Sequence, residues 1–185
     1  MDQKNKTSGP QDHVIDLLTV ANEYCLFIEK AHEYGKEEIF DYLHKISPLL
    51  YLKGTLIPNV DAGEPEIAKR FVTIETWENI FNGLRNVFGK DDEYWYIDEK
   101  TFNGEDVVKG SMAEDLSDIY QDLKDFVLLY NKRTHSAILS AISECRQLFY
   151  TNWGYKIIRI QKNIHHLLYR HHLDSDFISL NIQDE

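Results

Sequence analysis

The sequence predicts an all-α protein, most simply an antiparallel helical bundle of about five to six helices with a long C-terminal helix. Apolar residues recur at steps of three and four along most of the chain, and no convincing strand alternation is found. The 185 residues are enough for one domain with its own core. We therefore expect a flexible N-terminal tail over residues 1–11, one helical-bundle domain over residues 12–172, and a C-terminal tail over residues 173–185.

The first periodic segment is expected to form a helix that begins with Asp12 as its N-cap and ends at Gly35. A second helix begins near Lys36. Pro48 is expected to break it, because proline lacks an amide hydrogen and clashes with the preceding turn. The chain would restart there with Ser47 as cap and continue to the next proline. The inward seam of the first helix is Val14, Leu18, Ala21, Cys25, Ile28 and His32.

A third helix is predicted over residues 73–88, followed by a mixed segment, "KDDEYWYIDEKTFNGEDVVKG". We expect that segment to be irregular, with a short turn of helix or some extended chain, and to lie as a lid across one end of the bundle. Ser111 is the expected N-cap of a fourth helix that ends near Tyr130. A fifth helix covers residues 134–171. It either continues straight and packs on the first three helices, or kinks at Trp153 and Gly154, where glycine admits a neighbouring backbone.

The composition excludes several classes of function. A formal charge of −11 and a pI near 5.1 disfavour binding to nucleic acids and to anionic membranes. The first twelve residues contain no apolar signal core, and the best apolar run is too short to cross a bilayer, so a cytoplasmic protein is predicted. Cys25 and Cys145 lie in apolar helical patterns without ligand spacing, and we expect them to be small buried side chains.

The fourth helix contains "EDLSDIYQDLKDF", in which five of thirteen residues are acidic. Its apolar residues form one stripe, and Glu114, Asp118 and Asp125 lie opposite that stripe at 100° per residue. Asp115 and Asp122 flank its edge. Charged faces of amphipathic helices are usually solvated, so most of these carboxylates are expected to face water.

One exception follows from the antiparallel hairpin formed by the fourth and fifth helices. Its loop centres near residue 132, which places Arg146 level with Asp118 and about one turn from Asp115 and Asp122. An arginine on an inward seam needs a carboxylate, because an unpaired buried charge is unfavourable. We therefore expect an ion pair between Arg146 and one of these three aspartates. Its predicted role is to fix the register of the two helices; the alternative is an anion-binding or catalytic role.

No metal, cofactor or catalytic motif is predicted. The four histidines of "HHLLYRHH" lack the i,i+4 spacing that places two imidazoles on one metal. Glu29 and His32 match one half of a dimetal motif, but the second half is missing, and His32 is read as a core histidine. No Walker loop, dinucleotide-binding turn or nucleophile elbow occurs in the sequence.

Two stretches, "EDLSDIYQDLKDFVLLY" and "ECRQLFYTNWGYKIIRIQKNIHHLL", resemble a bacterial family known as domain of unknown function 5063. The resemblance covers the last third of the chain, and before residue 110 only the helical layout and "LLYL" are similar. It implies a helical fold and no assigned activity. Asn152 and Lys156 stand where histidines flank the Trp-Gly pair in other members. The matching positions are Asp115, Leu116, Asp118, Ile119, Tyr120, Asp122, Leu123, Lys124, Arg146, Phe149, Trp153, Gly154 and His165.

Two functions from different classes fit these observations. The first is a non-catalytic interaction or accessory module with an unknown protein partner, because no complete reactive constellation occurs. The second is a ligand-binding protein or enzyme with a polar pocket near Trp153 and Gly154. A DNA mimic that uses the −11 charge is a third reading. The candidate walls of the pocket are Asp118, Tyr120, Asp122, Arg146 and Trp95.

Overall fold

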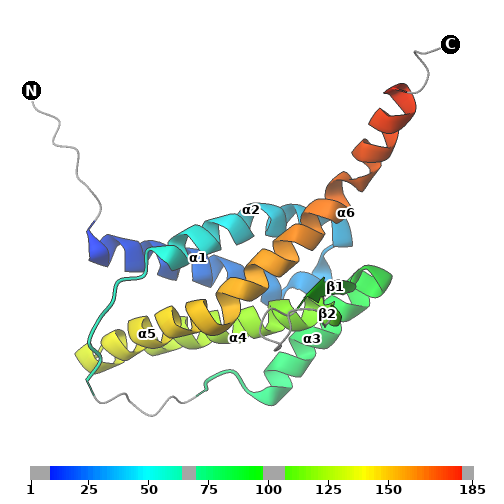
Figure 1. Cartoon of the computed structure of the whole chain (residues 1–185). Coiled ribbons are helices and arrows are strands. Elements are labelled where there is room, and N and C mark those ends of the chain that lie inside the picture. Colours follow the sequence, from blue (N-terminus) through cyan, green and yellow to red (C-terminus); the bar gives the residue numbers. More distant parts are fainter. Residues whose placement is uncertain (1–8, 64–69, 98–106, 181–185) are drawn as a thin grey trace, which may run out of the picture.

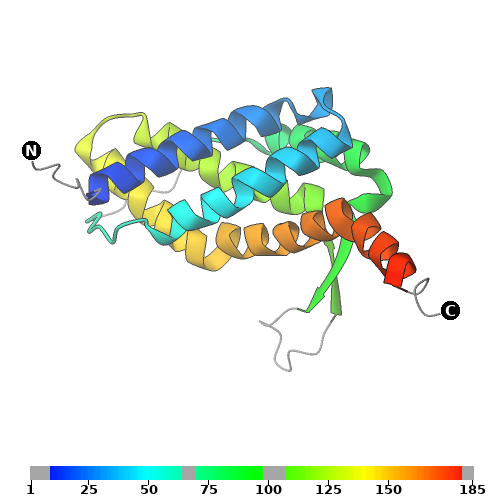
Figure 2. The same cartoon turned by 90° about the horizontal axis from the view of Figure 1, so that it is seen from above.

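The computed structural model describes residues 9–63, 70–97 and 107–180, with side chains described as far as residue 170. It shows a helical bundle with a long C-terminal helix, as predicted, together with one small β-hairpin (Figures 1 and 2). The elements are α1 (Pro10–Glu29), α2 (Lys36–Thr55), α3 (Ile74–Phe88), β1 (Glu93–Ile97), β2 (Val107–Ser111), α4 (Met112–Tyr130), α5 (His135–Leu148), a π-helical turn (Phe149–Trp153) and α6 (Gly154–Leu180).

Helix α4 lies at the centre of the bundle. It packs against α1, α3, α5 and α6, so 13 of its 19 residues are buried. The predicted solvated face is therefore wrong in part: Asp125, expected to face water, is only 8% exposed, and Asp115 and Asp122 are buried as well. Buried carboxylates on a central helix require donors from the elements that pack against them.

Helix α1 begins three residues earlier than expected. Gly9 is the N-cap and Pro10 the first helical residue, while the side chain of Asp12 accepts a hydrogen bond from the Gly9 amide at 2.9 Å. The helix also ends early, at Glu29, and a 3-10 turn follows. Because of that turn His32 is exposed, so the expected core histidine is wrong.

The predicted break at Pro48 is also wrong, since α2 runs through it without interruption. Proline cannot donate to the carbonyl of His44, four residues earlier. That carbonyl accepts a hydrogen bond from the Nε2 atom of Gln161 at 3.4 Å, and the same nitrogen lies 3.0 Å from Nδ1 of His44. A side chain on α6 thus supplies the donor that Pro48 lacks and ties α6 to α2.

The long fifth helix of the sequence analysis is divided by a π-helical turn, and the chain changes direction there (Figure 1). The amide of Gly154 donates to the carbonyl of Phe149, five residues earlier. A Cβ atom at Gly154 would lie 2.4 Å from that carbonyl oxygen, so glycine is needed for its own helix and not for a second backbone. On α2, a Cβ at Gly54 would lie 2.5 Å from the ring of Phe149. Trp153 packs beside this ring and is fully buried.

The mixed segment forms an antiparallel hairpin, which the sequence analysis had not predicted as strands. Glu93 pairs with Ser111 at one end and Ile97 with Val107 at the other. Tyr94 points toward the bundle and is buried, whereas Trp95 is 65% exposed. Each strand has only five residues, which is too short for a clear alternation in the sequence.

Three further expectations concern the ends of the chain, the cysteines and membranes. Helix α6 extends to Leu180, so residues 173–180 are helical and not an extended tail. Residues 1–8 and 181–185, in the predicted tails, lie outside the described residues. Cys25 and Cys145 are free and buried as expected, and burial raises the pKa of both thiols. Among the described helices, none is long and apolar enough to cross a membrane.

We expect Gly54→Ala and Gly154→Ala to lower the free energy of unfolding by roughly 1–3 kcal/mol each, because an added methyl group would force Phe149 to move. Gly83→Ala on α3 is the matched control, since its Cβ would lie 3.6 Å from Cβ of His32, an ordinary contact. Alanine is favoured over glycine inside a helix by about 0.5–1 kcal/mol, so this variant should be more stable. Urea unfolding of the three variants provides the measurement. Equal destabilisation by all three would contradict the packing account.

Candidate functional site

Three of the predicted aspartates lie along one side of α4, each with donors from other elements. Asp115 is buried, with 5% of its surface exposed. Its Oδ1 atom accepts from Arg159 on α6 at 2.8 Å and lies 3.6 Å from the amine of Lys156. Its Oδ2 atom accepts from the hydroxyl of Tyr94 on β1. This one carboxylate therefore connects α4 to both the hairpin and α6.

Asp118 lies one turn further along and is partly exposed. Its Oδ1 atom accepts from the indole nitrogen of Trp77 on α3 at 2.8 Å, and its Oδ2 atom forms an ion pair with Lys156. The amine of Lys156 is thus shared between two carboxylates that are three residues apart on the helix. The side chain of Lys156 is 15% exposed, which shields this pairing from water.

Asp122 and Asp125 form the second half of the cluster. Asp122 accepts from Arg70 at 2.8 Å through Oδ1 and from Asn152, in the π-helical turn, at 2.7 Å through Oδ2. Arg70 also lies 3.3 Å from Oδ2 of Asp125. Two successive backbone amides, those of Phe71 and Val72, donate to Oδ1 of Asp125 at 2.9 and 3.0 Å. The segment before α3 is thereby fixed onto α4.

All eight oxygens of these four carboxylates accept at least one hydrogen bond, and we call the four aspartates with their donors the α4 carboxylate network. Burial raises the pKa of Asp115 and of Asp122 above the usual aspartate value, while the hydrogen bonds that they accept oppose that rise. No group of three or more metal-ligating side chains occurs among the described residues. The network is consequently suited to holding elements together, since its oxygens are already occupied.

Arg146 does not take part in the network, so the predicted ion pair is wrong. Its guanidinium lies 3.5 Å from the side-chain oxygen of Asn59 and 4.9 Å from the centre of the Tyr150 ring. The sequence placed Arg146 level with Asp118, but Lys156 and Arg70 pair with the carboxylates from other elements. Matching residues across the hairpin of the fourth and fifth helices could not take account of cations from elements outside that hairpin.

Tyr120, Trp153, Gly154 and Trp95 are also separated from the network. The hydroxyl of Tyr120 donates to Glu29 at 2.9 Å, and Lys124 forms an ion pair with the same carboxylate oxygen at 2.7 Å. Trp153 and the ring of Phe149 fill the space beside Gly154, where the alternative reading placed a pocket. Trp95 lies on the exposed side of the hairpin.

Sequence reasoning missed all six side chains that donate to the network, which are Arg70, Trp77, Tyr94, Asn152, Lys156 and Arg159. Lys156 and Arg159 are three residues apart, which is the spacing that places two cations on one face of a helix. This spacing could have identified the two cations in the sequence. The five acidic residues of α4, which need partners, gave a second indication. Arg70 and Tyr94 belong to a loop and a short strand, and no periodic pattern places such residues.

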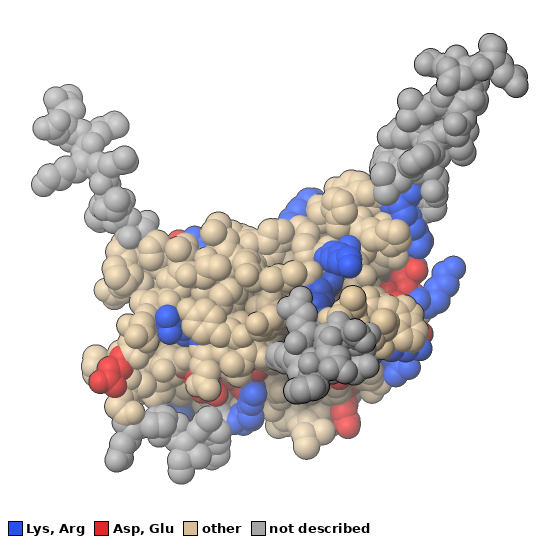
Figure 3. All heavy atoms as spheres, viewed as in Figure 1, with Lys and Arg blue, Asp and Glu red and all other residues tan. Residues whose placement is uncertain are grey.

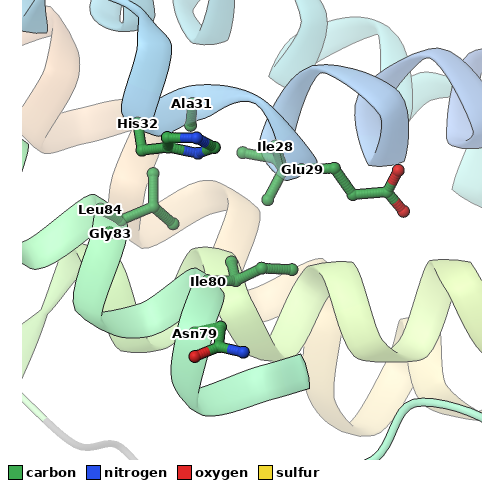
Figure 4. Close-up of a pocket in the computed structure, with 8 residues that line it drawn as sticks. All are labelled: Ile28, Glu29, Ala31, His32, Asn79, Ile80, Gly83 and Leu84. Carbon is green, nitrogen blue, oxygen red and sulfur yellow. The ribbon is translucent and has the colours of Figure 1, made fainter. Parts of the chain in front are cut away.

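A cleft of about 130 Å³ lies between the end of α1 and α3 (Figure 4). Ile28, Ile80 and Leu84 form its apolar wall, and His32 stands at its rim. The carboxylate of Glu29 points away from His32 (Figure 4). It accepts hydrogen bonds from Tyr120 and Lys124. Glu29 and His32 therefore do not converge as the dimetal half-motif would require.

These features define a class of protein, a helical bundle built around a buried acidic helix. The family model described as domain of unknown function (DUF5063) matches residues 8–170, and the chain belongs to that family. The crystal structure of protein BF1032 from Bacteroides fragilis is similar, with a TM-score of 0.74 and 30% sequence identity over 84% of this chain and 91% of that chain. No curated protein matches the chain. The family match thus extends well before residue 110, where the sequence had shown only a common layout.

A double-mutant cycle should assign the cation that pairs with Asp118. We expect a coupling free energy of roughly 0.5–2 kcal/mol between Asp118→Ala and Lys156→Met, because these side chains form a direct and partly shielded ion pair. Asp118→Ala and Arg146→Met should be additive within about 0.5 kcal/mol, since no contact joins them. Urea unfolding at neutral pH gives the four stabilities of each cycle. A stronger coupling with Arg146 than with Lys156 would reverse the assignment.

Asp122→Asn should remove a contribution to the free energy of unfolding that decreases as pH rises above the usual pKa of an aspartate. Burial raises the pKa of Asp122, so the folded protein holds this proton more tightly than the unfolded chain does. The stability from this proton is present below the unfolded pKa and is lost as pH rises through the folded pKa. Asparagine has no such proton to release.

Asp91→Asn provides a control of opposite sign for this pH dependence. The hydrogen bond from Lys36 lowers the pKa of Asp91, so its contribution is present at neutral pH and is lost as pH falls. Free energies of unfolding measured across the pH range should therefore separate the two variants. Identical pH profiles for the wild type and Asp122→Asn would contradict the raised pKa.

Proposed function

We propose that the protein is a bacterial, cytoplasmic, non-catalytic interaction module, and that its partner surface is the face formed by α2 and α6. Helices α2 and α6 pack side by side, and large apolar residues on this face remain open to solvent. Leu52 is 54% exposed on α2, while Tyr155 and Ile158 are 53% and 52% exposed on α6. Tyr150, in the π-helical turn, is 50% exposed. This set, which we call the α2–α6 face, carries the proposal.

The distribution of charge supports the choice of surface. Figure 3 shows few charged side chains over the face that α2, α5 and α6 present, although the whole chain has a formal charge of −11. Exposed apolar surface on a soluble protein commonly marks an interaction site. Tyrosine and other large side chains are enriched in the centres of protein interfaces, where charged residues are depleted.

The interior supports a non-catalytic role. The carboxylates of the α4 carboxylate network each have donors and are not directed into an open cavity. The place proposed for a pocket, beside Trp153 and Gly154, is filled by aromatic side chains. The family relationship and a relative from a bacterium support the bacterial origin, and the free cysteines are consistent with a reducing compartment.

Site-specific photocrosslinking in the native cell tests the partner surface. A photoreactive phenylalanine analogue at Leu52 or Ile158 should give an adduct of one defined mass, because both positions lie on the proposed face. Ile74 is the matched control: it is an apolar residue on α3 and is 78% exposed. Leu52→Glu should suppress the adduct formed from position 158 at least about tenfold, since a buried unpaired charge weakens an interface by a few kcal/mol.

Several outcomes would contradict this function. Adducts from position 74 that match those from positions 52 and 158 would show non-specific contact. An adduct of twice the chain mass would show self-association in place of a separate partner. The lack of any adduct at positions 52 and 158 would leave the face without an occupant and would overturn the proposal.

A further inference from the structure

A second cleft, separate from the α2–α6 face, lies where the start of the hairpin meets α6. Its volume is about 270 Å³, and its walls come from the turn before β1, from β1 itself and from α6. Lys90, His166 and Arg170 line it together with Trp95 and Leu167. Cationic and hydrogen-bonding groups thus stand beside an aromatic ring and an apolar side chain.

Basic groups are in excess around this cleft. Asp91 in its wall lies 2.5 Å from Lys36 and 4.0 Å from Arg170, and Glu93 pairs with Lys109 at 2.7 Å. Among the described residues, neither Lys90 nor His166 has a salt-bridge partner. The lining itself has two acidic side chains and, besides His166, two basic ones. Together with Lys36 and Lys109, which pair with the acidic side chains from outside the lining, four basic side chains stand near two acidic ones in a protein whose total formal charge is −11. A local surplus of this sign attracts a small anion.

Trp95 differs from the other tryptophans of the protein. Trp153 is fully buried, and the indole nitrogen of Trp77 donates to Asp118. Trp95 is 65% exposed, which leaves a large apolar ring in water. An aromatic ring in this position can bind a flat ligand by stacking, an interaction that is favourable for any planar base.

The strand that carries Trp95 is fixed in place. The neighbouring Tyr94 is buried and donates its hydroxyl to Asp115, and the guanidinium of Arg159 lies 4.3 Å from the centre of the Tyr96 ring. Two of the contacts of β1 with the bundle thus flank the exposed indole. A ring held before the ligand arrives loses little conformational entropy on binding.

We propose that this cleft binds a mononucleotide. Lys90, Arg170 and His166 bind its phosphate, and the base stacks on Trp95 against the apolar side chain of Leu167. A phosphate accepts several charge-assisted hydrogen bonds, which these three side chains are able to donate. The negative charge of the whole protein disfavours a long polyanion, because binding one requires an extended basic surface. A single nucleotide needs only the local excess of basic side chains around the cleft.

Titration with adenosine 5′-monophosphate, followed by tryptophan fluorescence and isothermal calorimetry, tests this inference. We expect saturable quenching, because Trp95 is the most exposed of the three indoles that could respond. Adenosine and ribose 5-phosphate should each bind at least about tenfold more weakly, since each lacks one of the two recognised groups. Inorganic phosphate and a ten-nucleotide single strand complete the series.

Variants that each remove one positive charge distinguish binding in the cleft from non-specific electrostatic attraction. Lys90→Gln and Arg170→Gln should each weaken binding of the mononucleotide about tenfold or more, and Trp95→Leu should weaken it and remove the fluorescence change. Lys45→Gln is the matched control: it removes the same charge from α2, where the side chain of Lys45 is 69% exposed. Circular dichroism verifies that each variant is folded, which is expected because all four positions lie at the surface.

Three results would overturn the inference. The first is no saturable binding of adenosine 5′-monophosphate. The second is an equal loss of binding in Lys45→Gln and Arg170→Gln, which would indicate non-specific attraction. The third is tighter binding of inorganic phosphate or of the oligonucleotide than of the mononucleotide. Because Leu52 and Ile158 are not in this cleft, their variants should retain nucleotide binding, so this test is independent of the proposed partner surface.

Discussion

The burial of carboxylates on α4 is the constraint on which the rest of the structure depends. A carboxylate in the interior is stable only when its oxygens are hydrogen-bonded or paired with cations. Helix α4 is surrounded by other elements, and the donors that its carboxylates require come from several of them. Arg70 comes from the segment before α3, Tyr94 from the hairpin and Lys156 from α6. Residues that are distant in the sequence thereby become parts of one polar cluster, and the fold depends on their simultaneous presence.

The π-helical turn serves the same cluster. A π-turn adds one residue to a helical turn, so the faces of α6 are rotated relative to those of α5. This rotation presents Asn152 to Asp122 and Lys156 to Asp118. The additional residue brings the carbonyl of Phe149 close to Gly154, where no side chain fits. The local distortion of the helix and its glycine are thus explained by the geometry that the carboxylates require.

The helices were predictable from the sequence because their periodicity reflects the burial of one face, which is a local property. The exceptions share a physical cause: a partner from a distant element altered a local preference. Pro48 stays within α2 because Gln161 donates to the carbonyl that proline leaves free. Asp125 is buried because two backbone amides from outside its hairpin bind it. The register that predicted an ion pair for Arg146 holds no information about cations from other elements.

All the carboxylate oxygens of the α4 carboxylate network are hydrogen-bonded within the protein, and this affects where a ligand or partner can bind. Groups whose hydrogen-bonding capacity is used within the protein have little left for a ligand, so recognition depends on surfaces that the network holds in position. The hairpin illustrates this link, since Asp115 binds both Arg159 of α6 and Tyr94 of β1. The exposed indole beside Tyr94 thus stands on a strand fixed by a buried carboxylate, opposite a helix fixed by the same carboxylate. The distance across the cleft between them is therefore set by the core, and the geometry available to a ligand is a consequence of how α4 is neutralised.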